Sequence, residues 1–461
     1  MVFLYESLRD LDESLQKSLG LPLIFGVGNP VELIPQLVQE WKVSHFCFEW
    51  DSEPYALERD TKLTAQLPSH VKVSSPVGHT LYDPRAVIRA SGSRDGSPPA
   101  SYQSFLKVIA KLGPVEAPLQ APKKSAFPAL KSLPAEAFIK HRTMRLDEAW
   151  TLIMSQAKDL PFIDKLTTQT PPVRPDTVPF TGGETEAIVR MDRWLKEKSD
   201  KILAFHKPMT APTALHPNEE TTVLSPYLKF GCLSARTFYH AIMDLYQRRR
   251  SEKKTQPPES LDGQLLWREF FYTNGYGVRG FDKMTENQLC RQINWRPYDG
   301  AQLTAKTSGM PANADRKNPA HFVYFWEHAQ TGYPWIDAAM TQLKQQGWMH
   351  HLARHAVACF LTRGDLYCHW EAGRDVFDRL LLDADWSLNN GNWLWLSASA
   401  FFHQFFRVYS PVAFPKKTDP SGAYVRHFLP KLAKFPAKYI YEPWKAPKEI
   451  QAAAGCVIGR D

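Results

Sequence analysis

The chain has 461 residues, a formal net charge of +8 and 12% aromatic residues. This length exceeds one ordinary domain, and the positive charge suits an anionic partner such as nucleic acid. Apolar runs are too short to cross a bilayer, a secretory leader pattern is absent, and the six cysteines form no CxxC pair. We therefore expect no membrane attachment and a location in the nucleus or cytoplasm, with an organelle left open.

Residues 1–115 alternate between helical and strand-like segments. Helices are expected over 4–19 and 30–41, and strands over 21–27 and 45–49. Strand–helix–strand alternation predicts a doubly wound parallel sheet, so this first domain is expected to be α/β.

The rest of the chain divides into a linker and a helical domain. Residues 116–180 are rich in proline and lysine with little periodicity except over 145–158, which favours a linker on the surface. From Gly182 onward the pattern is helical, with loop signals between the helices. We therefore expect an all-α domain over 181–461.

Two stretches of the helical domain concentrate polar side chains among large apolar ones. The first, 347–361, predicts a helix that carries His351 and His355 on one face. The second, 382–395, places two aspartates and three asparagines between tryptophans. A few polar groups fixed among apolar rings suit a ligand held by directed hydrogen bonds.

Metal binding fits these stretches less well. His351 and His355 have the spacing of a zinc pair, but no Glu follows the first histidine and no third ligand is marked. A calcium loop starting at Asp383 fails because Leu388 replaces the required glycine and Leu394 the required glutamate. Ordinary burial of the histidines and tryptophans stays open.

These stretches, together with the run Ser397-Ala-Ser-Ala-Phe-Phe-His-Gln-Phe-Phe-Arg-Val-Tyr-Ser-Pro411, closely resemble the photolyase/cryptochrome flavoproteins. The similar branch holds the (6-4) photolyases and animal-type cryptochromes. This resemblance implies FAD as the cofactor, a helical FAD-binding domain and an α/β domain that can hold an antenna chromophore. UV-damaged DNA is the implied partner of a monomer, and clock or transcription proteins would be partners of a cryptochrome.

The resemblance also implies which residues contact FAD. A loop ahead of a helix at 221–225 would hold the pyrophosphate, because helix N-termini attract anions, although a plain helix cap gives the same pattern. Arg354 would pair with Asp383 and keep that carboxylate ionised beside the flavin, and Asn389 would face flavin N5. The expected contacts are Thr221, Thr222, Val223, Leu224, Ser225, Gln264, His351, Arg354, Asp383, Ala384, Asp385 and Asn389.

The histidines imply how repair would proceed. A (6-4) lesion must accept an electron and then a proton, and imidazole titrates near neutral pH. By resemblance His351 and His355 are the catalytic pair, with His351 nearer the flavin. An indole and an amide suit stacking on a flipped base and reading its edge. The expected contacts with the lesion and its phosphates are Gln264, Trp267, Trp395, Tyr409 and Lys417.

A row of oxidisable rings is also implied by the resemblance. Trp393, Trp370 and Trp326 match the family's electron-hopping chain from flavin to surface, and Tyr367 would extend it.

The chain departs from the family pattern in three places. Relatives begin with a further strand and helix, and that strand is normally central, so an antenna chromophore is a weaker expectation than FAD. Residues 297–318 read as an inserted surface or disordered loop. The long tail of many signalling cryptochromes is missing after residue 461.

The sequence thus predicts light-driven repair of (6-4) pyrimidine–pyrimidone photoproducts by electron transfer from reduced FAD, with proton transfer from the histidines. The alternative is an animal-type cryptochrome that acts as a blue-light receptor and circadian transcriptional regulator, and dual function stays open. A dark flavin oxidoreductase would need a nicotinamide site, and the sequence has no Gly-x-Gly-x-x-Gly fingerprint.

Overall fold

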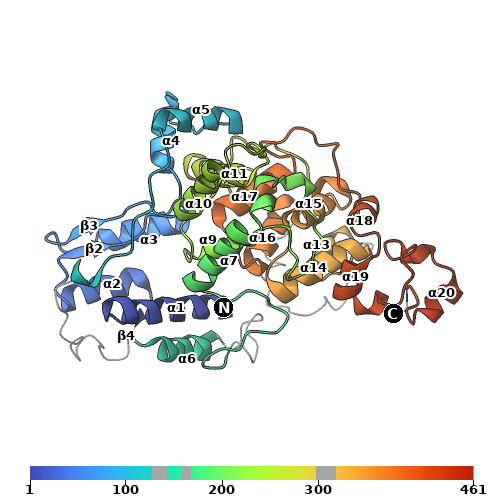
Figure 1. The fold of residues 1–461 in the computed structure, drawn as a ribbon, viewed down its shortest axis with the longest axis horizontal. Coiled ribbons are helices and arrows are strands. Elements are labelled where there is room, and N and C mark those ends of the chain that lie inside the picture. Colours follow the sequence, from blue (N-terminus) through green and yellow to red (C-terminus); the bar gives the residue numbers. More distant parts are fainter. Residues whose placement is uncertain (127–142, 158–167, 297–317, 460–461) are drawn as a thin grey trace.

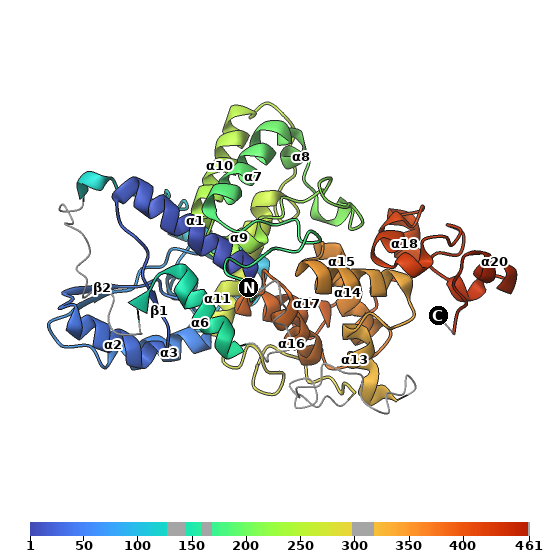
Figure 2. The same ribbon diagram turned by 90° about the horizontal axis from the view of Figure 1, so that it is seen from below.

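The computed structural model describes residues 1–126, 143–157, 168–296 and 318–459. Figures 1 and 2 show the strand-bearing N-terminal part at one end, a helical part in the middle and α20 at the other end. The predicted order of an α/β part followed by a helical part is confirmed. No helix within the described ranges is long and apolar enough to cross a membrane.

The N-terminal part combines short strands with longer helices, and the expected helices over 4–19 and 30–41 are present. Asn29 caps the second of these by accepting from the Val31 amide at 3.1 Å, and proline follows at its first position. Its elements are α1 (Val2–Leu19), β1 (Phe25–Gly26), α2 (Pro30–Glu40), β2 (His45–Cys47), α3 (Pro54–Thr64), β3 (Lys72–Ser74), α4 (Pro84–Ser91) and α5 (Tyr102–Leu112).

Strand pairing is more limited than the alternation predicted. In the described ranges parallel pairing is seen between β2 and β3, whereas β1 pairs antiparallel with β4 (Thr143–Met144). The expected strand over 21–27 is reduced to Phe25–Gly26, and Pro22 near its start has no amide to donate. The strand β1 therefore pairs with β4 and does not extend the β2–β3 pair.

Part of the expected linker packs firmly on the N-terminal helix. The helix α6 (Leu146–Ala157) lies beside α1, and the Trp150 ring meets the Tyr5 ring edge-on at 5.1 Å. An ion pair of 2.7 Å between Arg145 and Asp12 adds a polar contact. The domain boundaries at 115 and 180 stay predictions.

The helical part follows. Its helices are α7 (Glu184–Glu197), α8 (Ser199–Leu203), α9 (Ser225–Lys229), α10 (Ala235–Arg248), α11 (Leu261–Gly277), α13 (Phe322–Glu327), α14 (Pro334–Gln346), α15 (His351–Cys359), α16 (Trp370–Leu380), α17 (Trp386–Leu396), α18 (Ala413–Thr418), α19 (Ala423–Phe428) and α20 (Lys448–Ala453). The predicted surface loop at 297–318 lies outside the described residues except for Asn318.

Two glycines bring α11 and α17 into close contact. A Cβ added to Gly275 on α11 would stand 2.5 Å from the Ser387 hydroxyl, and one added to Gly391 on α17 would stand 2.3 Å from the Phe271 ring. Real Cβ atoms do not come that close, so larger residues would force the helices apart. This contact sets the polar face of α11 against the aspartates and asparagines at the start of α17.

The helix α15 is buried on the side that faces the core. His350 caps it, since its Nδ1 accepts from the Leu352 amide at 3.1 Å, and a single π turn (Phe360–Gly364) ends it. Buried Ala353 and Ala356 let neighbouring helices approach, while His351 and His355 stay on the less buried side.

Candidate functional site

Three adjoining cavities lie between α9, α11, α15 and α17. We call them the inner cavity (about 220 Å³), the loop cavity (about 270 Å³) and the mouth cavity (about 360 Å³). The inner cavity is lined by residues that include Tyr272, His351, Arg354, His355, Asp383, Ala384, Asp385, Asn389 and Trp393. The loop cavity includes Thr221, Thr222, Val223, Leu224, Ser225 and Gln264. The mouth cavity includes Gln264, Trp267, His355, Trp395 and Tyr409.

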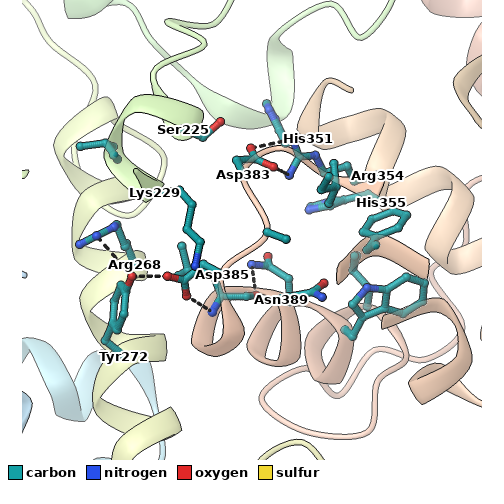
Figure 3. A pocket seen from close by; sticks show the side chains of 18 of the residues that line it. Ser225, Lys229, Arg268, Tyr272, His351, Arg354, His355, Asp383, Asp385 and Asn389 are labelled. Atoms are coloured by element: carbon teal, nitrogen blue, oxygen red, sulfur yellow. Dashed lines mark hydrogen bonds and ion pairs between the residues drawn. The ribbon is translucent and has the colours of Figure 1, made fainter. Parts of the chain in front are cut away.

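Both carboxylates of the inner cavity are held by hydrogen bonds. Asp383 accepts two parallel bonds from the Arg354 guanidinium, at 3.0 and 2.9 Å, as the sequence predicted (Figure 3). Asp385 caps α17 by accepting from the Leu388 amide at 3.0 Å, and its other oxygen accepts from the Tyr272 hydroxyl. Burial raises the pKa of Tyr272 well above its usual value, so this hydroxyl remains a donor.

A hydrogen bond fixes the orientation of the Asn389 side-chain amide. Its Nδ2 donates to the Arg374 carbonyl at 3.0 Å, and the residue lines the inner cavity (Figure 3). Within the part of the chain that the structure describes, this leaves the amide oxygen for another donor.

The loop at 221–225 is not used up as a helix cap. The short helix α9 begins at Ser225 after Leu224 as its N-cap, with no side-chain cap bond, and Thr221 and Thr222 line the loop cavity ahead of it. Val223 has a φ of 51°, a conformation that branched residues rarely adopt. Such backbone strain is typical of loops shaped around a ligand.

The two histidines connect the cavities. His351 lines the inner and loop cavities, His355 lines the inner and mouth cavities, and their ring centres are 6.0 Å apart. Burial, with neighbouring positive charges, lowers the pKa of His351 well below its usual value and that of His355 to about 3. Both rings are therefore neutral near pH 7 in the free protein.

Hydrogen bonds define the orientation of the pair. The His351 Nε2 donates to the Lys207 carbonyl at 3.0 Å, because a carbonyl can only accept. The His355 Nδ1 lies 3.4 Å from the Tyr409 hydroxyl.

Aromatic rings surround the mouth cavity. The Trp267 indole stacks on Tyr102 of α5 at 4.0 Å and meets Trp395 edge-on at 5.1 Å, so one of its faces is already covered. Gln264 donates from Nε2 to the Pro258 carbonyl at 2.8 Å. Lys417 is exposed on α18 and lines none of the three cavities.

The expected electron chain stays a prediction, and the structure adds the burial and spacing of its rings. Trp393, Trp370 and Trp326 are all buried, and Trp326 is 0% exposed with its centre 6.2 Å from that of Trp393. The Trp326 ring is therefore shielded from solvent in this structure. Tyr367 is 43% exposed and lies 4.9 Å, centre to centre, from the buried Trp295, a contact that sequence reasoning missed.

Sequence reasoning also missed a polar chain that links the inner cavity to the α/β part. On α11, Arg268 pairs with Glu269 at 3.0 Å, and Glu269 accepts from the Leu81 amide at 2.8 Å. Arg268 also lies over the Tyr272 ring at 4.6 Å. An adjacent Arg and Glu between apolar residues in the segment Leu265–Phe271 was the available signal, since buried charges need partners.

Comparison with known proteins shows which family this chain belongs to. A model of the FAD binding domain of DNA photolyase matches residues 260–461, and a DNA photolyase model matches residues 1–123. The chain belongs to the photolyase/cryptochrome family. A (6-4)DNA photolyase of Arabidopsis thaliana is 47% identical over 100% of this chain and 74% of its own length. Cryptochrome-1 of Erithacus rubecula is 44% identical, covering 99% and 66% respectively.

Solved structures agree in fold. A cryptochrome of Synechocystis sp. PCC6803 superposes with a TM-score of 0.70 at 23% identity, over 99% of this chain and 83% of that one. A class III photolyase of Agrobacterium tumefaciens gives a TM-score of 0.67 at 24% identity, with the same two coverages. The cofactor of this photolyase-family chain is FAD, as the sequence predicted.

Proposed function

We propose that this chain is a light-dependent DNA repair enzyme that acts on (6-4) pyrimidine–pyrimidone photoproducts. The observation that carries the proposal is the position of the histidine pair. Both histidines line the inner cavity, and His355 also lines the aromatic mouth cavity, so the pair extends from one cavity to the other. The similarity to (6-4)DNA photolyases of Arabidopsis thaliana and Oryza sativa, at 47% and 45% identity, supports the lesion class.

The residues of the inner and loop cavities fit a flavin dinucleotide. The loop at 221–225 offers hydroxyl groups and backbone amides to a pyrophosphate. Asp383 and Asn389 present oxygen acceptors to a polar ring edge. When bound, FAD supplies light absorption and a one-electron donor. The protein's part is to hold the ring rigidly, with Arg354 and Tyr272 fixing the two carboxylates.

The mouth cavity fits an extruded base. Trp267 and Trp395 form two walls at 79° to each other, and Gln264 lies beside them with its amide oxygen directed away from Pro258. Flipping a base costs a few kcal/mol, and less for a damaged pair, which favours the lesion over intact DNA. Exposed Lys417 would contact the phosphates.

The histidine pair would supply the proton that the lesion needs. His351 is fixed by its bond to the Lys207 carbonyl, and His355 by Tyr409, so both rings present defined edges to the site. Positioned proton transfer of this kind contributes typically 10²- to 10⁴-fold to a rate.

A light-receptor function is the alternative, favoured by the 44% identity to cryptochrome-1 of Erithacus rubecula. A receptor would bind and photoreduce FAD without restoring damaged bases. Regulatory proteins would then be its partners in place of DNA.

A repair assay separates the two proposals. Reduced protein is illuminated with two oligonucleotides, one carrying a (6-4) photoproduct and one a cyclobutane dimer, beside dark controls. Light-dependent recovery of intact bases from the (6-4) substrate alone is expected. If neither substrate is restored while FAD is bound and photoreducible, the receptor function is favoured.

A further inference from the structure

Lys207 lies where the three cavities of the site join, and it lines all of them. It begins a short 3₁₀ turn (Lys207–Met209) after α8, and the residue is half-buried. Its amide donates to the Glu259 carbonyl at 3.1 Å, and its carbonyl accepts from His351 at 3.0 Å. Two backbone hydrogen bonds therefore fix where the side chain starts.

The Lys207 ammonium has no carboxylate within ion-pair distance in the described ranges. The two carboxylates nearest the flavin site are taken: Asp383 by Arg354, and Asp385 by Tyr272 and an amide. Glu259 is the acidic residue that lines the mouth cavity, and it takes part in none of the ion pairs seen among the described residues. An unpaired charge that is partly removed from water is costly, and such a group in a cavity is a candidate functional residue.

The other groups around Lys207 make its proton easier to lose. Burial, and then the Arg354 charge, lower the pKa of Lys207 to about 8. His350, His351 and His355 all sense the Lys207 charge, and burial already keeps the three rings neutral. Arg268, which lines the inner cavity too, is paired with Glu269.

The histidine pair, when both rings are neutral, has no proton that it can readily give up. A neutral imidazole carries one N–H, and that of His351 is already donated to the Lys207 carbonyl. A ring that gave up this proton would become an anion in a buried site, which is costly. The pair needs a neighbouring acid to work near pH 7.

We propose that Lys207 is the acid that supplies a proton to the histidine pair during the repair reaction. This inference rests on the proposed function. One N–H bond of the ammonium breaks and one N–H bond forms on the free nitrogen of an imidazole. The imidazole passes a proton to the base that has accepted the electron. When the bases are restored, the electron and the proton both return, so neither is consumed.

The test compares two variants of the full FAD-loaded protein. Lys207→Met removes the ammonium at nearly constant length, and Lys207→Arg keeps the charge but holds its proton too tightly to give it up. Lys201→Met on α8, an exposed lysine away from the cavities, is the matched control. FAD content, photoreduction and affinity for a (6-4) oligonucleotide are measured beside repair per absorbed photon.

Both Lys207 variants are expected to lose about 10²-fold in repair per photon at pH 7 while keeping FAD and photoreduction. Wild-type repair should fall as the pH rises through about 8, and the control should follow the wild type. A ¹⁵N-lysine NMR signal that disappears in Lys207→Met should titrate near pH 8 in the DNA-free protein.

Three results would overturn the inference. These are wild-type repair by Lys207→Met, full rescue by Lys207→Arg, or a Lys207 signal that titrates at the ordinary value of about 10.4. If the wild type restores no (6-4) lesion at all, the proposed function falls and the proton role falls with it. Failure of the variants to behave as expected beside an active wild type overturns the Lys207 inference alone.

Discussion

The Arg354 guanidinium donates a hydrogen bond to each carboxylate oxygen of Asp383, with N···O distances of 3.0 and 2.9 Å. Arg354 belongs to the histidine helix α15, and Asp383 precedes α17, so this pair locks the two helices that build the inner cavity. The Arg354 Nε donates further to the Met349 carbonyl at 2.9 Å, which leaves the guanidinium little freedom. The cavity is therefore shaped before any ligand enters.

Replacing Asp383 with asparagine should weaken FAD binding by about 10- to 100-fold. The substitution leaves the Arg354 charge without its partner, and a lost charged hydrogen bond costs about 1.5–3 kcal/mol. Flavin release on dilution, followed by fluorescence, measures the effect. Asp192→Asn, which breaks an exposed pair with Lys196, is the control and should retain FAD. Equal retention by both variants would contradict the role given to Asp383.

Acid should destabilise the fold through His350. Burial lowers the pKa of His350 to about 3, so below pH 6.5 the unfolded chain binds a proton that the folded chain refuses. Stability is therefore lost as the pH falls from about 6.5 towards 3, by about 2 kcal/mol at pH 5. His350→Asn keeps a capping acceptor and removes the titration. Urea unfolding at pH 8 and pH 5 should show a smaller loss in that variant, and an equal loss would refute the assignment.

Trp393→Phe should slow the photoreduction of oxidised FAD. Trp393 lines the inner cavity and contacts other aromatic rings, so it is placed to give an electron first. Trp194→Phe is the control, because buried Trp194 belongs to a separate core cluster and lines none of the three cavities. Absorbance changes under blue light measure the rate. Normal photoreduction in Trp393→Phe would remove this residue from the electron chain.

Lys417→Ala should weaken binding to damaged and undamaged DNA alike. Lys417 is exposed on α18, outside the cavities, so it is placed for phosphate contact rather than base reading. The slope of log affinity against log salt should become shallower by about 0.9. Trp267→Ala, in contrast, should cost about 1–3 kcal/mol for the lesion only. A change confined to the lesion in Lys417→Ala would contradict the phosphate role.

Much of the site could be predicted because it lies in two short stretches. His351, Arg354 and His355 lie on neighbouring turns of one helix, and Asp383 follows within thirty residues of Arg354. The partners supplied by tertiary contacts could not be predicted in this way. Lys207 meets His351 across 144 positions, and Tyr102 covers Trp267 from the α/β part. Burial of Trp326 likewise depends on how helices pack, which periodicity does not show.

The strand pattern was predictable only as a class. Alternating helices and strands indicated an α/β part, but the partner of each strand depends on contacts between distant segments. Phe25 faces Met144 in β4, a segment whose composition had favoured a linker.

Single-turnover repair of a (6-4) oligonucleotide by wild-type protein and His351→Ala is the decisive experiment, with FAD content and photoreduction recorded on the same samples. We expect the variant to bind and photoreduce FAD normally and to have lost repair, because proton supply is separate from the electron path. Unchanged repair by His351→Ala would contradict the proposed mechanism, since the pair that joins the two cavities would then have no part in the chemistry.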